Sequence, residues 1–222
     1  AENGKLEPEA LVLAGYSQGA LHTLHVAEQE AKNGDPLGIR RYLAINPPVE
    51  MYYGLQTLDG FYQTGSGWSK KEAAQRIVNA AGVYLMASEM PVSEKSTLPV
   101  DEESARFLIG FGYRLTLTEL LASIHKRQPL PAISTPYHWS NQTALYEEIT
   151  PHDYQWYVDE VLVPYYSARW ERPVTLPELN ERSGVKAVGA TLKNNDKVFV
   201  LTNWDDFLLT DGERDYLAAT FQ

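Results

Sequence analysis

Cysteine is absent from the 222-residue sequence. This absence excludes disulfide bonds, a thiolate nucleophile and thiolate metal sites. It also means that cysteine usage does not indicate whether the compartment of the protein is oxidising or reducing. Long hydrophobic runs are lacking as well. No stretch of about eighteen consecutive apolar residues occurs, so the sequence predicts no membrane span. The lack of cysteine does not exclude serine as a side-chain nucleophile.

Positive charge is scarce relative to negative charge. The chain has 19 lysines and arginines against 29 aspartates and glutamates, which gives a formal net charge of −10. Such a field does not attract nucleic acid or an anionic membrane, so neither is a predicted partner. The five histidines show no metal-ligand spacing with a third ligand, and no metal site is predicted. A hydrophobic share of 44% with 22% charged residues is typical of a globular protein with a core.

One stretch near the N-terminus carries a recognisable pattern. Leu11 to Ala14 is a short apolar run of strand length, and Ala20 to Ala31 has apolar residues at helical spacing. Between them lies the motif Gly15-Tyr16-Ser17-Gln18-Gly19. The order strand, G-x-S-x-G, helix is the context that predicts a nucleophile elbow.

The chemistry of such an elbow explains its residue types. Ser17 at the tip of a tight turn is expected in a strained backbone conformation that exposes its hydroxyl, and side chains at Gly15 or Gly19 are expected to crowd the returning helix. The start of a helix leaves free N–H groups, of which that of Gln18 is best placed to bind an oxyanion. The competing interpretation is an ordinary strand-to-helix turn with an exposed serine.

Two further strands are predicted. Ile39 to Ile45 is an apolar run that fits a buried parallel strand, and Lys197 to Thr202 is apolar and β-branched. Asp205 and Asp206 follow the second of these strands after a short turn. The simpler interpretation of this pair is that the two carboxylates only cap the loop.

These two ends of the chain resemble the α/β-hydrolase superfamily, through GYSQGA after LVLA and through residues 197–209. The resemblance implies that Ser17 is the nucleophile, that Asp206 is the triad acid, with Asp205 as the alternative, and that the strand at 39–45 lies beside the elbow strand. Asn203 stands where the superfamily usually has glycine. The resemblance implies no cofactor.

The catalytic histidine departs from the superfamily pattern, which places it after the acid. All five histidines precede Asp206: His22, His25, His125, His138 and His152. The first two lie on the elbow helix, where helical geometry carries them away from Ser17. The other three lie in the predicted insertion, where any one of them could approach the cleft, the alternative being a surface or structural role. We therefore expect a fragment that lacks the first sheet strands and a histidine segment beyond Gln222.

The expected fold class is α/β, an α/β-hydrolase-type, mostly parallel sheet that is incomplete in this chain, with a large helical cap insertion. The expected division is residues 1–48 for the first part of the hydrolase core, 49–193 for the helical insertion and 194–222 for the acid-bearing strand and a last helix. The boundary at residue 49 rests on a change from strand-and-helix alternation to long helical segments.

Within the insertion, helix starts are predicted at Ser69 and Thr150. Residues 102–127 are predicted to form one long helix or two, because Gly110 and Gly112 weaken the middle, and residues 154–170 to form another, with a kink at Pro164. A shorter helix is predicted to begin after Thr175. The insertion is rich in aromatic residues. Most are expected in helix interfaces, and the alternative is that several line a substrate pocket over Ser17.

The predicted function is a serine hydrolase that cleaves a carboxylic ester through an acyl-enzyme on Ser17. An amidase or aminopeptidase of the same fold, or a catalytically inactive binding domain, is the alternative. The expected partner is a small ester or acyl compound, and exposed sheet edges make a homo-oligomer possible.

Overall fold

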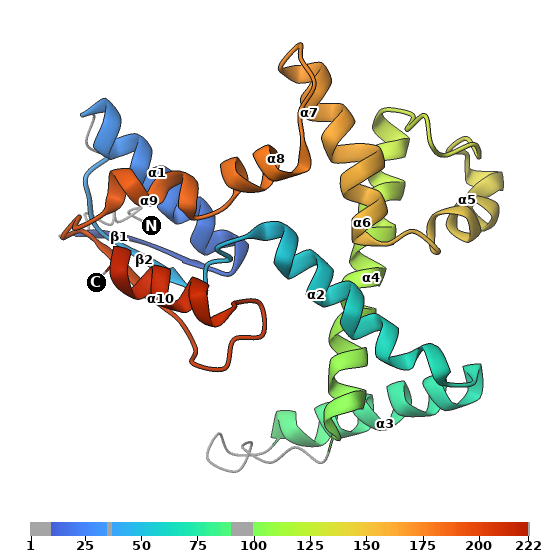
Figure 1. The fold of residues 1–222 in the computed structure, drawn as a ribbon. Coiled ribbons are helices and arrows are strands. Elements are labelled where there is room, and N and C mark those ends of the chain that lie inside the picture. Colours follow the sequence, from blue (N-terminus) through green and yellow to red (C-terminus); the bar gives the residue numbers. More distant parts are fainter. Residues whose placement is uncertain (1–9, 35–36, 90–99, 222) are drawn as a thin grey trace, which may run out of the picture. The chain divides into compact units, whose positions relative to one another are not determined.

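The chain folds into two compact units (Figure 1). The structure, a computed structural model, describes residues 10–34, 37–89 and 100–221, without the side chains of residues 84 and 87–89. The sheet unit contains the described residues up to Gly54 and those from Pro173 onward, and the helical unit contains the described part of 55–172.

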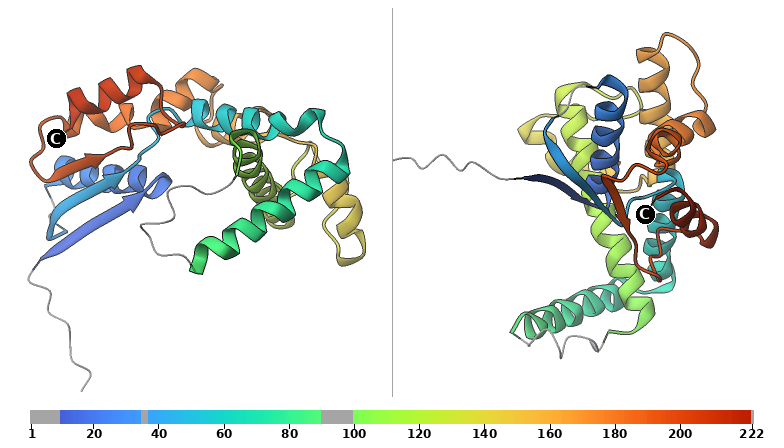
Figure 2. Two further views of the ribbon diagram at one scale, coloured as in Figure 1. Left: turned by 90° about the horizontal axis from the view of Figure 1, so that it is seen from below. Right: turned by 90° about the vertical axis from the view of Figure 1, so that its left-hand side faces the viewer.

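The sheet unit is built on three parallel strands, β1 (Leu11–Tyr16), β2 (Ile39–Ile45) and β3 (Val198–Leu201), in the order β1-β2-β3. Figure 2 shows the strands side by side. The register pairs Tyr16 with Ile45 and Ile45 with Leu201, so the three strands end at one edge. The α/β class and the parallel sheet are confirmed.

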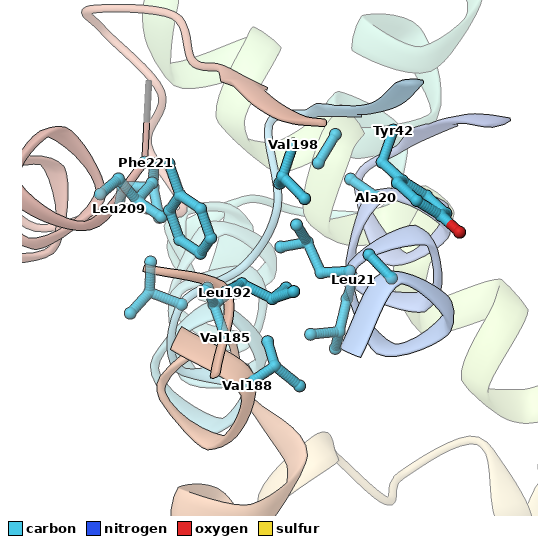
Figure 3. Packing of buried hydrophobic residues seen from close by; sticks show 14 residues of the cluster. Ala20, Leu21, Tyr42, Val185, Val188, Leu192, Val198, Leu209 and Phe221 are labelled. Atoms are coloured by element: carbon cyan, nitrogen blue, oxygen red, sulfur yellow. The ribbon is translucent and has the colours of Figure 1, made fainter. Parts of the chain in front are cut away.

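Three helices of this unit contribute to one hydrophobic core with the sheet: α1 (Gln18–Asn33), α9 (Lys186–Leu192) and α10 (Asp211–Thr220). In Figure 3, Val185, Val188 and Leu192 lie opposite Leu21 of α1, with Val198 of β3 above them in this view. Val185 directly precedes α9. These apolar residues are at most 5% exposed, so their burial is the main favourable contribution to the stability of the unit.

The other face of the sheet is open among the described residues. Side chains alternate between the two faces of a strand, and Gly15 faces α1, so Val12 and Tyr16 point to the opposite side. They are 59% and 67% exposed, and Leu201 at the end of β3 is 55% exposed. Parallel sheets are normally covered on both faces, and here one face remains accessible.

Helix α2 (Met51–Gln63) contains the division between the units. The other described elements of the helical unit, in chain order, are η1 (Thr64–Gly67), α3 (Lys70–Glu89), α4 (Glu102–Arg127), η3 (Trp139–Asn141), α5 (Gln142–Ile149), α6 (Tyr154–Tyr157), the π-helical turn η4 (Val158–Leu162) and α7 (Val163–Arg169). Residues 102–127 form one uninterrupted helix, α4, rather than two.

Helix α4 is the centre of the helical unit. A Cβ atom at Gly110 would lie 2.2 Å from the backbone nitrogen of Tyr62, so this glycine lets α4 approach the end of α2. Phe107 contacts the rings of Tyr62, Trp68 and Phe111, with centroids 5.9, 4.8 and 5.8 Å away. Part of the aromatic content of the predicted insertion therefore forms a helix interface.

By length and composition, α4 is also the one helix in the described ranges that could cross a membrane. Its best 18-residue window has a mean hydropathy of 1.3, and 39% of that window is buried. The buried residues of α4 include Leu117 and Leu121, and also Arg114, which pairs with Asp59. A core helix of a folded unit has these properties.

The predicted division of the chain is wrong at its second boundary. Helices α8 (Leu176–Ser183) and α9 fall within the predicted insertion, yet they belong to the sheet unit, which resumes at Pro173 rather than at 194. The physical reason is the apolar surface of the α9 segment, which packs against α1 and the strands. The first boundary moves from 48 to 54 because Val49 is buried in the same core.

The helix starts predicted from capping residues are confirmed in part. Ser69 caps the start of α3, and Thr175 that of α8, each by accepting a hydrogen bond from the third residue beyond it. The start predicted at Thr150 is wrong, because Thr150 ends α5 and Asp153 is the residue whose side chain caps α6. The helix predicted over 154–170 contains the π-helical turn η4 immediately before α7, whose second residue is Pro164.

Glu148 of α5 provides a pH test of the helical unit. Its carboxylate accepts hydrogen bonds from the N–H groups of Ser134 and Thr135 at 2.7 and 2.8 Å. These bonds, first that from the Ser134 N–H, lower the pKa of Glu148 from 4.5 to about 2. A lowered pKa in the folded state means that the carboxylate stabilises the fold fully above its unfolded pKa, and that this stabilisation is lost as the pH falls toward 2.

We therefore expect a carboxyl-carbon NMR titration to give Glu148 a midpoint near 2, and Glu148→Gln to weaken the acid dependence of unfolding between about pH 5 and pH 2. Glu147→Gln, on an exposed part of the same helix, controls for the loss of one negative charge. A Glu148 midpoint near 4.5 would contradict the prediction.

Candidate functional site

The ends of the three strands bring the predicted site residues to one edge of the sheet. Ser17 follows β1 directly, Asn46 follows β2, and the loop with Asp205 and Asp206 follows β3. The carboxyl edge of a parallel sheet is where α/β proteins commonly bind ligands. Segments from the first and the last part of the chain thus meet at the edge of the sheet where ligand binding is common in α/β proteins.

Ser17 lies in the sharp turn between β1 and α1. Its backbone has φ 52° and ψ −120°, a left-handed conformation that a side chain rarely adopts and that costs on the order of 1–3 kcal/mol. Its N–H donates to Ile45 at 2.8 Å, and its carbonyl accepts from Ala20 at 2.9 Å. The turn is therefore held from both sides, while the Ser17 side chain makes no capping hydrogen bond to α1.

The two motif glycines differ in their roles. A Cβ atom at Gly15 would lie 2.0 Å from the carbonyl oxygen of Gly19 and 2.5 Å from the hydroxyl oxygen of Thr23, so α1 lies directly against the strand. At Gly19 a Cβ atom would have no neighbour within 4 Å. The expectation that a side chain at Gly19 crowds the helix is wrong, because Gly19 faces away from the strand.

Gln18 is the first residue of α1, where backbone N–H groups lack an intrahelical acceptor. The positive end of the helix dipole lies at the same place, next to Ser17. This arrangement suits the binding of negative charge beside the Ser17 hydroxyl, and the role of the Gln18 N–H as an oxyanion donor stays a prediction.

The loop after β3 holds the two candidate acids differently. Asp206 is half-buried, and its Oδ1 accepts the N–H of Leu208 at 2.9 Å. Its carbonyl oxygen accepts the guanidinium of Arg214 at 3.0 Å. Asp205 is exposed. Asp206 is therefore the carboxylate whose position the loop fixes, and its second oxygen accepts no hydrogen bond from the described residues.

Asn46 is a site residue that the sequence analysis did not identify. Asn46 has φ 51°, and its Oδ1 accepts the N–H of Asn203 at 2.9 Å. The contact spans 157 residues, so no local pattern indicates it. The one sequence signal is that asparagine tolerates the left-handed conformation better than most residues.

Within the described residues of the sheet unit, neither His22 nor His25 hydrogen-bonds to Ser17 or Asp206. His22 is exposed on α1, and burial lowers the pKa of His25 on the same helix. The other three belong to the helical unit.

Each of those three makes a contact within the helical unit. The Nδ1 atom of buried His125 accepts the N–H of Leu130 at 3.0 Å. His138 contacts the hydroxyl of Ser140 at 2.7 Å. His152 stacks on Trp156 with ring centroids 3.7 Å apart, and burial lowers its pKa.

The helical unit contains a cavity of about 690 Å³. Tyr137, Tyr146 and Pro151 line it, together with polar residues that include Glu147. Aromatic residues thus border a hollow in this unit, and a substrate pocket over Ser17 stays a prediction. Across the described ranges, no three histidine or carboxylate side chains are grouped as a metal ion would require.

Comparison of the chain with models of protein families, with curated proteins and with solved structures found no match. The function must therefore be argued from the site.

Proposed function

We propose that the protein is a serine hydrolase of α/β-hydrolase type that cleaves a carboxylic ester through an acyl-enzyme on Ser17. The observation that carries the proposal is the backbone of Ser17, strained at φ 52° between the parallel strand β1 and the start of α1. Strain of this kind persists where the surrounding structure enforces it, and it is concentrated at functional sites.

In the proposed reaction, the Ser17 hydroxyl oxygen attacks the ester carbonyl carbon, and the proton of the hydroxyl passes to a base. The N–H of Gln18 stabilises the oxyanion of the tetrahedral intermediate. The intermediate collapses, the protonated base returns the proton to the departing alkoxide so that the alcohol leaves, and the acyl group stays on Ser17. Water then cleaves the acyl-enzyme and restores the hydroxyl.

Asp206 is the proposed acid of the triad, because its loop follows the strand beside β2 and its carboxylate keeps one oxygen available. Its partner in this proposal is a histidine that the described contacts do not identify. The helical unit is the proposed cap insertion, which selects the acyl group.

A catalytically inactive binding domain is the second candidate function. It is favoured by the contacts within the sheet unit, because neither of its two described histidines, His22 and His25, bonds to Ser17 or Asp206. An isolated serine hydroxyl is a weak nucleophile.

A fluorophosphonate probe, which modifies activated serines, separates the two candidates. If the proposal is correct, the chain is labelled at Ser17, and Ser17→Ala loses at least about 99% of the labelling because no other hydroxyl is activated. The reaction is run with and without added imidazole, which supplies a base if the chain provides none. Ser123→Ala, an exposed serine on α4, is the matched control.

Equal labelling of the wild-type chain and of Ser17→Ala under both conditions would favour the binding domain. If Ser17 is labelled, p-nitrophenyl esters compared with aminoacyl p-nitroanilides distinguish an esterase from the amidase alternative.

A further inference from the structure

The peptide group between Ile45 and Asn46 lies between the candidate nucleophile and the candidate acid loop. Its carbonyl oxygen accepts the N–H of Ser17 at 2.8 Å, and its N–H donates to the carbonyl oxygen of Leu201 at 2.7 Å. Both contacts continue the sheet ladder past the ends of the strands. A single rigid plane therefore sets the position of Ser17 relative to the end of β3.

The Asn46 side chain extends this connection into the loop. Its Oδ1 accepts the N–H of Asn203 at 2.9 Å, and the carbonyl of Asn203 in turn accepts the N–H of Asp206 at 3.3 Å. Arg214 holds the far side of the loop through the carbonyl oxygens of Asp206 and Leu209. Asn46 thus secures the side of the loop that faces β2.

The residue type at position 46 matches both demands of the site. The backbone has φ 51°, which glycine or asparagine adopts with less strain than other residues. Glycine would meet that demand without supplying an acceptor for Asn203. Asparagine meets the backbone demand and supplies the acceptor as well.

We propose that Asn46 is a positioning residue that holds the Asp206 loop in register with Ser17. This inference rests on the proposed function, because the register matters for chemistry only if Ser17 and Asp206 act together. Asn46 itself has no part in bond making or breaking. Its effect passes through the loop to the carboxylate.

Two variants separate the acceptor from the backbone conformation. Asn46→Gly keeps the left-handed backbone and removes the acceptor, whereas Asn46→Asp keeps an acceptor oxygen at nearly the same place. Circular dichroism verifies the fold of each variant. Asn46→Ser, which shortens the side chain, replaces the glycine variant if that one fails to fold.

Two measurements are made on the full chain: exchange of the Asn203 amide proton by NMR, and the rate of Ser17 labelling by the fluorophosphonate. In Asn46→Gly we expect exchange at Asn203 to be about fivefold faster, because one hydrogen bond is lost. Labelling should slow about tenfold, because the acid is displaced. Asn46→Asp should restore both rates to near the wild-type values.

Unchanged exchange at Asn203 in Asn46→Gly would overturn the inference, and so would faster exchange with an unchanged labelling rate. Failure of the proposed function has a different signature, since the wild-type chain is then labelled no faster than Ser17→Ala. In that case exchange at Asn203 still reports the contact, but the positioning role of Asn46 is refuted together with the catalytic role of Ser17.

Discussion

Gly15→Ala is expected to lower the free energy of unfolding of the sheet unit by about 3 kcal/mol, the upper range for overpacking in a core. The new methyl carbon would lie 2.0 Å from the carbonyl oxygen of Gly19, which belongs to the backbone of α1 and cannot rotate away. Strand β1 and helix α1 must then separate. The separation also disturbs the Ser17 turn, so labelling by the fluorophosphonate should fall with stability.

Gly19→Ala is the matched control for this prediction. It adds the same methyl group to the same motif, but into open space. Alanine is a better helix former than glycine by up to about 1 kcal/mol, so this variant should be as stable as the wild-type chain or slightly more stable. Urea unfolding followed by circular dichroism, with amide exchange in β1 and α1, provides the measurement. Equal stability of the two variants would refute the close packing of α1 on β1.

The strand-turn-helix order around Ser17 could be predicted from the sequence because its determinants are local. An apolar run, a glycine before the serine and apolar residues at helical spacing occupy about twenty consecutive residues, and the structure places β1 and α1 there. The strand at 39–45 was predicted with its observed bounds for the same reason. In each case a short segment contains the whole signal.

The features that sequence analysis missed depend on contacts between distant segments. The α9 segment shows apolar spacing, but the spacing does not tell which unit the helix packs against. Asn46 contacts a loop 157 residues away. Gly15 and Gly19 are chemically identical, and only the path of α1 shows that a side chain at Gly15 would meet the helix backbone while one at Gly19 would meet open space.

The buried ion pair of the helical unit was also not predicted, because its partners lie on α2 and α4. Arg114 and Asp59 lie 3.1 Å apart, with side chains 7% and 9% exposed. The Asp59 carboxylate also accepts the N–H groups of Tyr154 and Gln155, and Arg114 donates to the carbonyl of His152. The pair therefore connects α2, α4 and the start of α6. Burial raises the pKa of Asp59 despite the Arg114 charge beside it.

Asp59→Asn and Arg114→Met are each expected to destabilise the helical unit by about 3–5 kcal/mol, because each leaves one charge buried without its partner. The double variant should be at least about 1 kcal/mol more stable than the sum of the two effects predicts, since it leaves no isolated charge.

Arg106→Met is the control: the exposed Arg106–Glu102 pair on α4 is expected to contribute less than about 0.5 kcal/mol. Urea unfolding followed by tryptophan fluorescence tests this, because four of the five tryptophans lie in the helical unit. Additive effects of the two single changes would show that Asp59 and Arg114 contribute independently, and that the cross-link between the helices does not depend on the charge pair.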